Sequence, residues 1–348
     1  RWTRKLYGDN TALLALTLFS FSPTVMAHSR LVTTDVAALF GVLYSSFYFL
    51  VYLKNPKFST FILAAFTFGV ALLTKFSTVL LIPYLVIVAL TWGWIHGDKI
   101  KFRIAGAVDY GLRAVLVFIV GFVIVVWPIY YIHVRNYPAD RQHRDTESIL
   151  SSIDKPSLSK PVIWASDKPY IRAAAQYGLG LLMVGQRSIS GNDIFYRGKV
   201  INEGGPSYFP FVYFIKEPLA WWALVVIALC CVGIHLKRKS AEGAGVSHWL
   251  KKYFDEYAML VWLVIYWAIS IESTLNIGVR HLLPAFPFMI ILVSGQIMKF
   301  KTYTKDRISH GHAFRFVMPT VIVALLGWYI FENISIYPHY LAYFNQVA

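Results

Sequence analysis

Long apolar stretches alternate with short charged breaks along the whole chain. Several stretches run about 18 or more residues almost without charge, the length that a helix needs to cross the hydrocarbon core of a bilayer. Because lipid offers no hydrogen-bond partners to the backbone, such stretches are predicted as helices rather than open strands. The pattern predicts nine spans, at residues 10–28, 35–53, 58–74, 76–95, 112–134, 219–236, 257–275, 280–298 and 316–334.

The predicted fold class is therefore an all-α polytopic membrane protein with one large extracytoplasmic loop. We expect about five transmembrane helices in 1–134, the loop in 135–218, and about four transmembrane helices with an outer tail in 219–348. Within the loop, apolar residues recur at helical spacing over 169–186 and predict an amphipathic helix on the outer membrane surface. A helix packed on its own loop explains the same spacing, and the sequence leaves both interpretations open.

Lys and Arg are distributed unevenly over the breaks. If the N-terminus of this chain is cytoplasmic, every inside break carries several of them, whereas the short outside turns carry one each, namely Arg30, Lys75 and Arg280. Positive residues concentrate in the short cytoplasmic loops of membrane proteins. We therefore expect a multi-pass protein with its large loop and C-terminus outside, and a bacterial inner membrane is favoured over the endoplasmic reticulum.

The composition supports a membrane protein and argues against a nucleic-acid-binding one. Hydrophobic residues make up 57% of the chain and charged residues 15%, with a mean hydropathy of +0.54. Soluble domains carry about 25% charged residues. The net charge of +15 would suit a nucleic acid, but the cations lie in the breaks between apolar stretches and not on one soluble surface. No nucleic-acid partner is expected.

Three short outside turns place ionisable residues at or near membrane depth. They lie at 28–35, 74–77 and 272–281. Ionisable groups at this depth cost free energy and rarely face lipid. Because all three turns fall on the side of the large loop, we expect them to frame one polar cavity, in which Arg30, Lys75 and Arg280 are the cations.

Several cations around one cavity suit an anion, and phosphate is the obvious candidate. Arg offers a planar fork to phosphate oxygens, and Lys offers a compact point charge. In a membrane this combination indicates a lipid-linked phosphate. Structural roles stay open: Arg30 and Lys75 can extend to the outer headgroups. Asp35 can begin the second span, and Arg280 can pair with Glu272.

Five stretches, in the expected order, carry a family resemblance. They are Ser22-Pro23 with 27–35, then 73–77, 208–218, 276–287 and 337–345. At these positions the sequence is similar to the membrane glycosyltransferases of the C superfamily, specifically to the protein O-mannosyltransferase-like group, family 39.

The resemblance implies transfer of a sugar, mannose or a related hexose or pentose, from a polyprenyl-phosphate carrier to an acceptor on the extracytoplasmic face. In such enzymes a carboxylate acts as general base on the acceptor hydroxyl, and cations stabilise the leaving phosphate. The implied partners are the lipid bilayer, the polyprenyl-phosphate-linked sugar, an acceptor protein, lipid or glycan, and further membrane subunits. Neither a cofactor nor a divalent metal is expected.

The resemblance assigns lipid-phosphate and sugar binding to Arg30, Asp35, Lys75, Arg280 and His281. The best-supported catalytic acid of the family lies in an outer loop before the third helix, whereas this sequence starts just before that helix. The catalytic residue therefore stays unassigned, with Asp35 as the candidate. The alternative is a non-catalytic membrane subunit that retains the glycosyltransferase fold. A transporter is disfavoured because paired broken spans with charge at mid-membrane are not evident.

Overall fold

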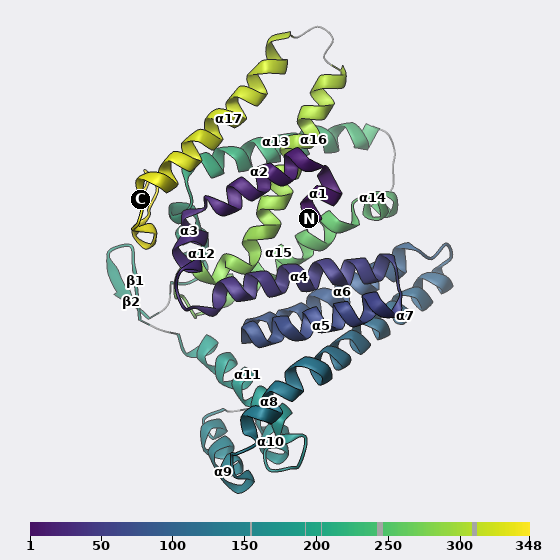
Figure 1. Ribbon diagram of the computed structural model, residues 1–348, viewed down its shortest axis with the longest axis vertical. Helices are drawn as coiled ribbons and strands as arrows, with labels where there is room; N and C mark the ends of the chain where they lie inside the picture. The colour runs from purple at the N-terminus through teal and green to yellow at the C-terminus, as the bar shows by residue number, and fades with distance from the viewer. Residues whose placement is uncertain (154, 192, 203, 242–245, 308–311) are drawn as a thin grey trace. The chain divides into compact units, whose positions relative to one another are not determined.

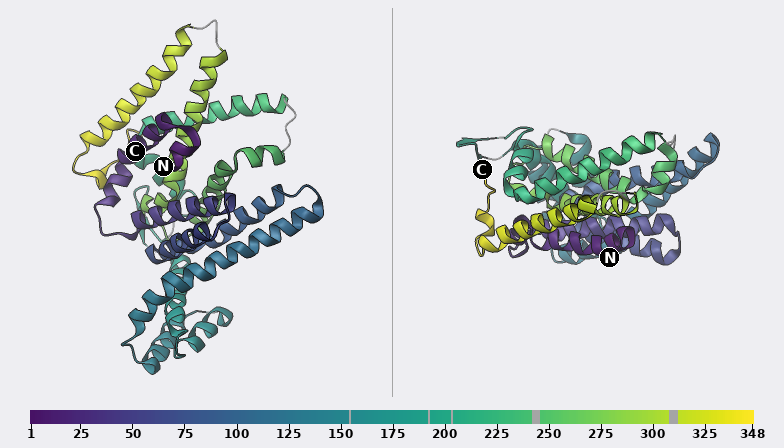
Figure 2. Two further views of the ribbon diagram at one scale, coloured as in Figure 1. Left: turned by 45° about the vertical axis from the view of Figure 1, so that its right-hand side comes forward. Right: turned by 90° about the horizontal axis from the view of Figure 1, so that it is seen from above.

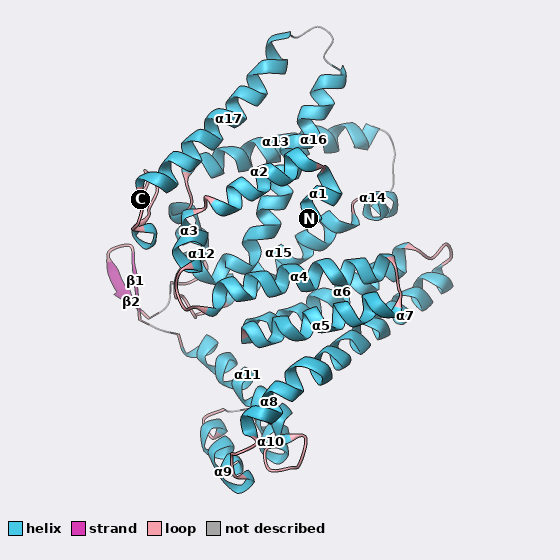
Figure 3. Ribbon diagram, in the orientation of Figure 1, coloured by secondary structure: helices cyan, strands magenta, loops and turns pink. Residues whose placement is uncertain are grey.

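The computed structural model describes residues 1–153, 155–191, 193–202, 204–241, 246–307 and 312–348, and within them all side chains except those of 235–241, 300–307 and 312–316. Helices account for nearly all of its regular structure, which confirms the predicted all-α class (Figure 3). One short hairpin joins β1 (Ile194–Tyr196) to β2 (Lys199–Ile201) in antiparallel register.

The chain divides into two compact units, which are described separately. The first unit comprises Arg1–Leu39, Phe209–Ser270 and Gly278–Ala348, and the second comprises Phe40–Tyr208 and Ile271–Ile277. The α-helices of the first unit, labelled in Figure 1, are α1 (Trp2–Tyr7), α2 (Asp9–Ser20), α3 (Pro23–Ser29), α12 (Tyr208–Lys216), α13 (Leu219–Ala241), α14 (Val246–Lys252), α15 (Phe254–Glu272), α16 (Phe286–Arg307) and α17 (His312–Ser335). The short helices η3 (Val279–Ala285) and η4 (Tyr340–Ala342) belong to the same unit.

The core of the first unit forms where α16 packs against α2, α13 and α17 (Figure 2). Leu18, Leu224 and Ile297 are fully buried at this junction. The hydroxyl of Tyr329 on α17 donates to the carbonyl of Leu18 at 2.9 Å, which satisfies a buried phenol. Apolar packing with one internal hydrogen bond therefore holds four sequence-distant helices together.

One predicted span, 10–28, is bent in this unit, and a second bend lies just before the predicted span 219–236. α2 and α3 meet at 62°, and α12 meets α13 at 110°. Both bends have a proline as their cause, because proline removes a backbone donor and its ring blocks a continuous helix. Pro23 follows Ser22, whose hydroxyl caps α3 by accepting from the Val25 amide at 3.3 Å, and Pro218 separates α12 from α13.

The second unit contains most of the first half of the chain. Its elements are α4 (Thr34–Lys54, which begins in the first unit), α5 (Phe58–Thr74), η1 (Phe76–Leu80), α6 (Leu81–Ile95), α7 (Ile100–Gly121), the π-helical segment η2 (Phe122–Val126), α8 (Trp127–Val134), α9 (Ala139–Leu150), α10 (Pro156–Ala165), α11 (Arg172–Ser190), β1 and β2.

Glycines bring the helices of the second unit into close contact. A Cβ atom built on Gly93 of α6 would lie 2.1 Å from the carbonyl oxygen of Gly106 on α7, and one built on Gly69 of α5 would lie 2.4 Å from that of Gly121. Small residues let helix backbones approach where lipid gives no hydrophobic drive for association. These contacts hold α5 and α6 against the long helix α7.

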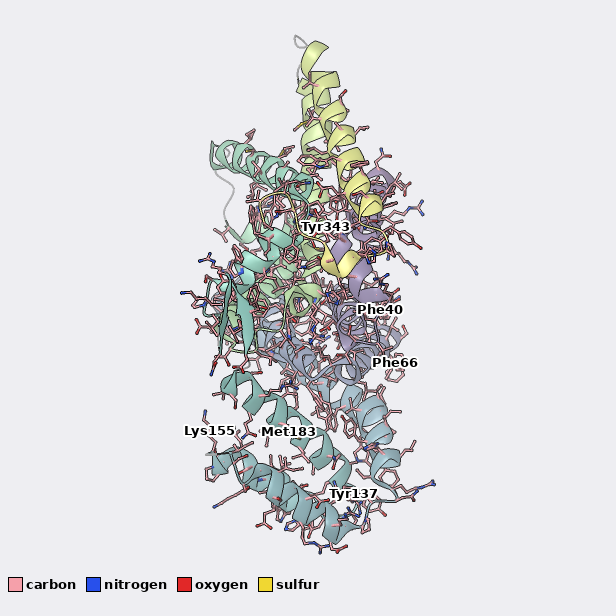
Figure 4. All side chains as sticks on the ribbon, turned by 90° about the vertical axis from the view of Figure 1, so that its left-hand side faces the viewer. Phe40, Phe66, Tyr137, Lys155, Met183 and Tyr343 are labelled. Carbon is pink, nitrogen blue, oxygen red and sulfur yellow. The ribbon has the colours of Figure 1, made fainter. Side chains whose placement is uncertain are left out.

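The segment 135–218, predicted as the outer loop, folds largely onto itself and onto α8. The predicted helix over 169–186 is confirmed as α11, which packs against α8, α9 and α10. Ala173, Tyr177 and Leu179 form its buried face. The N-terminal half of this helix therefore packs against protein, which agrees with the alternative of a helix packed on its own loop. Figure 4 shows α9 between Tyr137 and Lys155, with Met183 on the neighbouring α11.

Each predicted span falls on an apolar helix. Among the described residues, six helices are long and apolar enough to cross a membrane, or up to eight if each bent pair is one span, and α5 is a shorter apolar helix. The chain is thus an integral, multi-pass membrane protein.

The fifth span was predicted to begin at 112, but its helix extends over Ile100–Val134. Arg113 pairs with Asp109 one turn earlier at 2.9 Å, so the helix continues through charged residues.

Candidate functional site

The turn after α3 carries the first group of predicted site residues. Ser22 fixes the start of α3, and the helix ends at Ser29, where His28 is buried and Arg30 is exposed. Among the described residues, the Nδ1 atom of His28 has no hydrogen-bond partner. An unsatisfied buried ring nitrogen is costly, so this atom is available to a ligand.

Charged residues from three other elements lie around His28. Asp35 in the first turn of α4, Arg280 in η3 and Lys216 at the end of α12 all act electrostatically on its ring. α3 also packs directly against η3 and η4. Within the first unit, the structure therefore brings the predicted turn at 28–35 next to residues 278–281, the end of the predicted turn at 272–281, whereas Ile271–Ile277 belongs to the second unit.

The two arginines of this region are not neutralised by carboxylates. In the part of the chain that the structure describes, half-buried Arg280 makes no hydrogen bond or ion pair, and Arg30 makes only a cation–π contact, 5.6 Å from the ring centre of Tyr340. A cation near membrane depth normally finds a partner. Arg30 and Arg280 thus keep their guanidinium donors available for an anion.

Asp35 and His281 lie beside these arginines in sequence and structure. Asp35 is 4% exposed in the first turn of α4, where a carboxylate is favoured by the helix dipole. His281 is half-buried, with its ring centre 6.2 Å from that of Phe209, and its backbone carbonyl accepts from the Tyr266 hydroxyl. η3 is thereby fixed against α12 and α15.

The C-terminal segment after α17 packs against the end of α12 in this region. Lys216 donates through Nζ to the carbonyls of Leu341 at 3.0 Å and Tyr343 at 2.9 Å, and its ammonium lies 3.5 Å from the ring centre of Phe344. Asn345, 4% exposed, donates to the carbonyls of Phe214 and Glu217 at 2.7 and 2.9 Å. These bonds satisfy backbone carbonyls that the bend at Pro218 leaves free.

Two buried carboxyl groups, those of Glu332 and Glu217, stabilise this part of the first unit. Glu332 accepts from the Tyr343 hydroxyl and, at 2.9 Å, from Gln346. Burial, and then the bond to Glu332, raise the pKa of Tyr343 well above its usual range, so the phenol remains a donor. Glu217, 3% exposed, accepts from Ser22 at 3.4 Å and so ties the α12–α13 bend to the start of α3.

Lys75 is the one predicted site residue in the second unit. It lies between α5 and η1 with an extended backbone and is half-buried. Its carbonyl accepts from the Thr78 hydroxyl at 2.7 Å. Its place beside Arg30 and Arg280 remains a prediction.

Sequence reasoning placed His28 in the turn at 28–35 without giving it a role, and it did not assign Lys216 or Asn345 to the site region. All three lie in stretches that carried the family resemblance. For Lys216 the available signal was its charge at the end of an apolar stretch, two positions before Pro218. Nothing in the spacing indicated that Asn345 binds carbonyls about 130 residues earlier in the chain, because that contact depends on the tertiary fold.

The fold defines a polytopic helical membrane protein, and its turns bring Arg30 and Arg280 to adjoining elements. Within it, residues 1–130 match the family model of the dolichyl-phosphate-mannose-protein mannosyltransferases, which confirms the predicted resemblance over that part. No curated protein and no solved structure matches the chain. The match supports a membrane glycosyltransferase of the mannosyltransferase type. Among the described residues, no group of three or more His, Cys, Asp or Glu side chains is placed to hold a metal ion.

Proposed function

We propose that this protein transfers a sugar, mannose or a related hexose or pentose, from a polyprenyl-phosphate carrier to an acceptor on the extracytoplasmic side. The observation that carries the proposal is the pair of arginines, Arg30 and Arg280, which lie on adjoining elements and have no carboxylate partner among the residues that the structure describes. Two unneutralised guanidinium groups beside a buried His28 suit a phosphate monoester or diester.

The reaction that we infer breaks the bond between the anomeric carbon and the phosphate oxygen. The acceptor hydroxyl attacks the anomeric carbon while a carboxylate removes its proton, and the lipid phosphate leaves with the bonding electrons. Negative charge grows on the leaving phosphate, so preorganised cations stabilise the transition state more than the ground state. Arg30 and Arg280 have this role, and Lys75 is proposed as a third cation.

Asp35 and His281 are proposed as sugar-site residues. Asp35 is the candidate general base within this sequence, because it is a buried carboxylate in electrostatic range of His28. His281 adjoins Arg280 and presents an imidazole for hydrogen bonds to sugar hydroxyls. The acceptor is a protein, a lipid or a glycan, and the reaction proceeds without a cofactor or a divalent metal.

The second candidate function is that of a non-catalytic subunit with the same fold. The family match covers residues 1–130, and within this sequence the base on the acceptor hydroxyl has Asp35 only as a candidate. Co-purification in a fixed-stoichiometry complex without transferase activity would favour this function.

The test is in-vitro transfer from a synthetic polyprenyl-phosphate mannose by the purified protein and its variants. We expect Arg30→Ala and Arg280→Ala each to lower the transfer rate by about 10²–10³-fold, the usual effect of losing one transition-state donor. Arg187→Ala, which removes an exposed arginine of the outer loop, is the matched control and should retain full activity. Unchanged turnover in both site variants, with correct membrane insertion, would disprove the site assignment.

A further inference from the structure

A second binding region lies in the first unit, away from the arginine turns. A cavity of about 380 Å³ is lined by α13, α14, α15 and α16. Its walls are apolar for most of their length, with Leu229, Leu263 and Val293 among the lining side chains. Ligand pockets in proteins have volumes of this order, and none of the proposed transfer chemistry uses this one.

The length of the cavity matches one leaflet of a bilayer. Its lining residues extend from Met289 to Lys299 along α16 and from Glu256 to Leu263 along α15. Ten residue steps of helix measure about 15 Å, which is half of a hydrocarbon core about 30 Å thick. An acyl chain from one leaflet therefore fits its depth.

Polar and charged groups gather at one end. Glu256, Gln296 and Lys299 line this end together with the aromatic rings of Trp249 and Tyr253. Lys299 donates to Glu256 at 2.8 Å and lies 4.6 Å from the ring centre of Tyr253, so these two charges neutralise each other.

Two further cations lie next to the polar end, and among the described residues neither of them forms an ion pair. Lys251 and Lys252 end the short helix α14 and are exposed, and the ammonium of Lys252 lies 5.5 Å from the ring centre of Tyr253. Because Lys299 and Glu256 neutralise each other, Lys251 and Lys252 are the cations that this mouth offers to an anion. The charge distribution of the chain predicts that this end faces the cytoplasm, where anionic lipids attract such clusters.

We propose that this cavity binds one anionic phospholipid, with an acyl chain between α13, α15 and α16 and its phosphate at Lys251 and Lys252. The aromatic pair Trp249 and Tyr253 lies at headgroup depth, as aromatic residues do at membrane interfaces. The site is separate from the proposed transferase site and does not depend on that function. Its occupant stabilises the protein because it binds only the folded state.

Native mass spectrometry of the detergent-purified protein tests this site with two probe lipids, palmitoyl-oleoyl phosphatidylglycerol and palmitoyl-oleoyl phosphatidylcholine. We expect the wild-type protein to retain one phosphatidylglycerol in preference to phosphatidylcholine, with a matching rise in Tm. The double variant Lys251→Gln/Lys252→Gln should bind phosphatidylglycerol about tenfold more weakly. The control is Lys99→Gln/Lys101→Gln, which removes two exposed lysines elsewhere and should bind normally.

A second pair of variants tests the cavity itself. Leu263→Trp fills the space where the chain would lie and should abolish retention, whereas Val264→Trp, at a neighbouring position that is 68% exposed and outside the cavity, should retain the lipid. The lysine variants leave the packing intact and decide the outcome even where Leu263→Trp does not fold. Equal retention of both lipids, or normal binding by the lysine variant, would overturn the proposal. Displacement of phosphatidylglycerol by a lower concentration of polyprenyl phosphate would overturn it too and identify a donor-chain site.

Discussion

The cations of the turns, Arg30 and Arg280, and the cations of the segment 135–218 have different kinds of partner in the structure. In the loop, Arg172 donates to the carbonyl of Val134 at 2.8 Å and to that of Tyr137, and Arg144 pairs with Asp140 at 2.9 Å. In the turns, the described residues provide no oxygen partner for Arg30 or Arg280. The loop cations stabilise local structure, whereas the turn cations remain available to a ligand.

Replacing Arg280 with Lys or with Ala separates charge from geometry in the turns. Ala removes both, so we expect a loss of about 10²–10³-fold in transfer rate, whereas Lys keeps the charge and loses the planar fork. An intermediate loss of about tenfold is expected for Arg280→Lys, with the Tm of both variants unchanged. Rate measurements at saturating donor, together with thermal unfolding, provide this comparison. A large drop in Tm would instead place Arg280 among the structural cations.

Asn345→Ala should destabilise the region that holds the turns. The side chain is buried and its amide serves two carbonyls, while its oxygen accepts from the Val347 amide at 3.1 Å. Leaving buried carbonyls unpaired costs about 1–3 kcal/mol. Thermal unfolding in nanodiscs measures the loss, and Val347→Ala, at a position 61% exposed, is the control. Equal Tm values for both variants would mean that the C-terminal segment does not hold the α12–α13 bend.

Arg172→Ala should affect the loop and leave the chemistry intact. The guanidinium satisfies the carbonyls at the end of α8, and its loss costs about 1–2 kcal/mol of local stability. We expect faster amide hydrogen exchange in α8, α9 and the first turn of α11, with a normal transfer rate per folded molecule. If transfer fell as far as in Arg280→Ala, the contrast between the two regions would be wrong.

Arg144→Ala should have the smallest effect. Its partner Asp140 is exposed, and the hydrogen bond from Arg144 lowers the pKa of that carboxyl. A depressed carboxyl pKa adds stability only above the unfolded-state pKa, and this contribution disappears as the pH falls through the folded-state pKa. Exposed pairs of this kind contribute little, so we expect no resolvable change in Tm at pH 7 and none at pH 3. A clear difference at pH 7 would show that the pair is not solvated.

Much of the fold was predictable because lipid imposes simple rules on the sequence. Length and charge located the apolar helices of the predicted spans, whereas α12 and the bends at Pro23 and Pro218 were not predicted. The start of α7 at Ile100 was missed because an internal Asp109–Arg113 pair makes charged residues tolerable in a helix. Close contacts such as Gly93 with Gly106 depend on tertiary packing that no local pattern encodes.

The candidate site was predictable in part. The turns at 28–35 and 272–281 were recognised from charge at membrane depth. The structure brings Asp35 of the first turn and Arg280 of the other together around His28. The third turn, with Lys75, stays a prediction. Lys216 and Asn345 were missed as partners of the C-terminal segment because their contacts join positions more than 120 residues apart.

The affinity of the purified protein for polyprenyl phosphate without a sugar tests the central claim most directly. If Arg280 binds the leaving phosphate, Arg280→Ala should weaken this affinity by at least tenfold, equivalent to about 1.4 kcal/mol, while Arg172→Ala binds as the wild type does. Equal dissociation constants for the wild type and Arg280→Ala, in protein of normal Tm, would contradict the account.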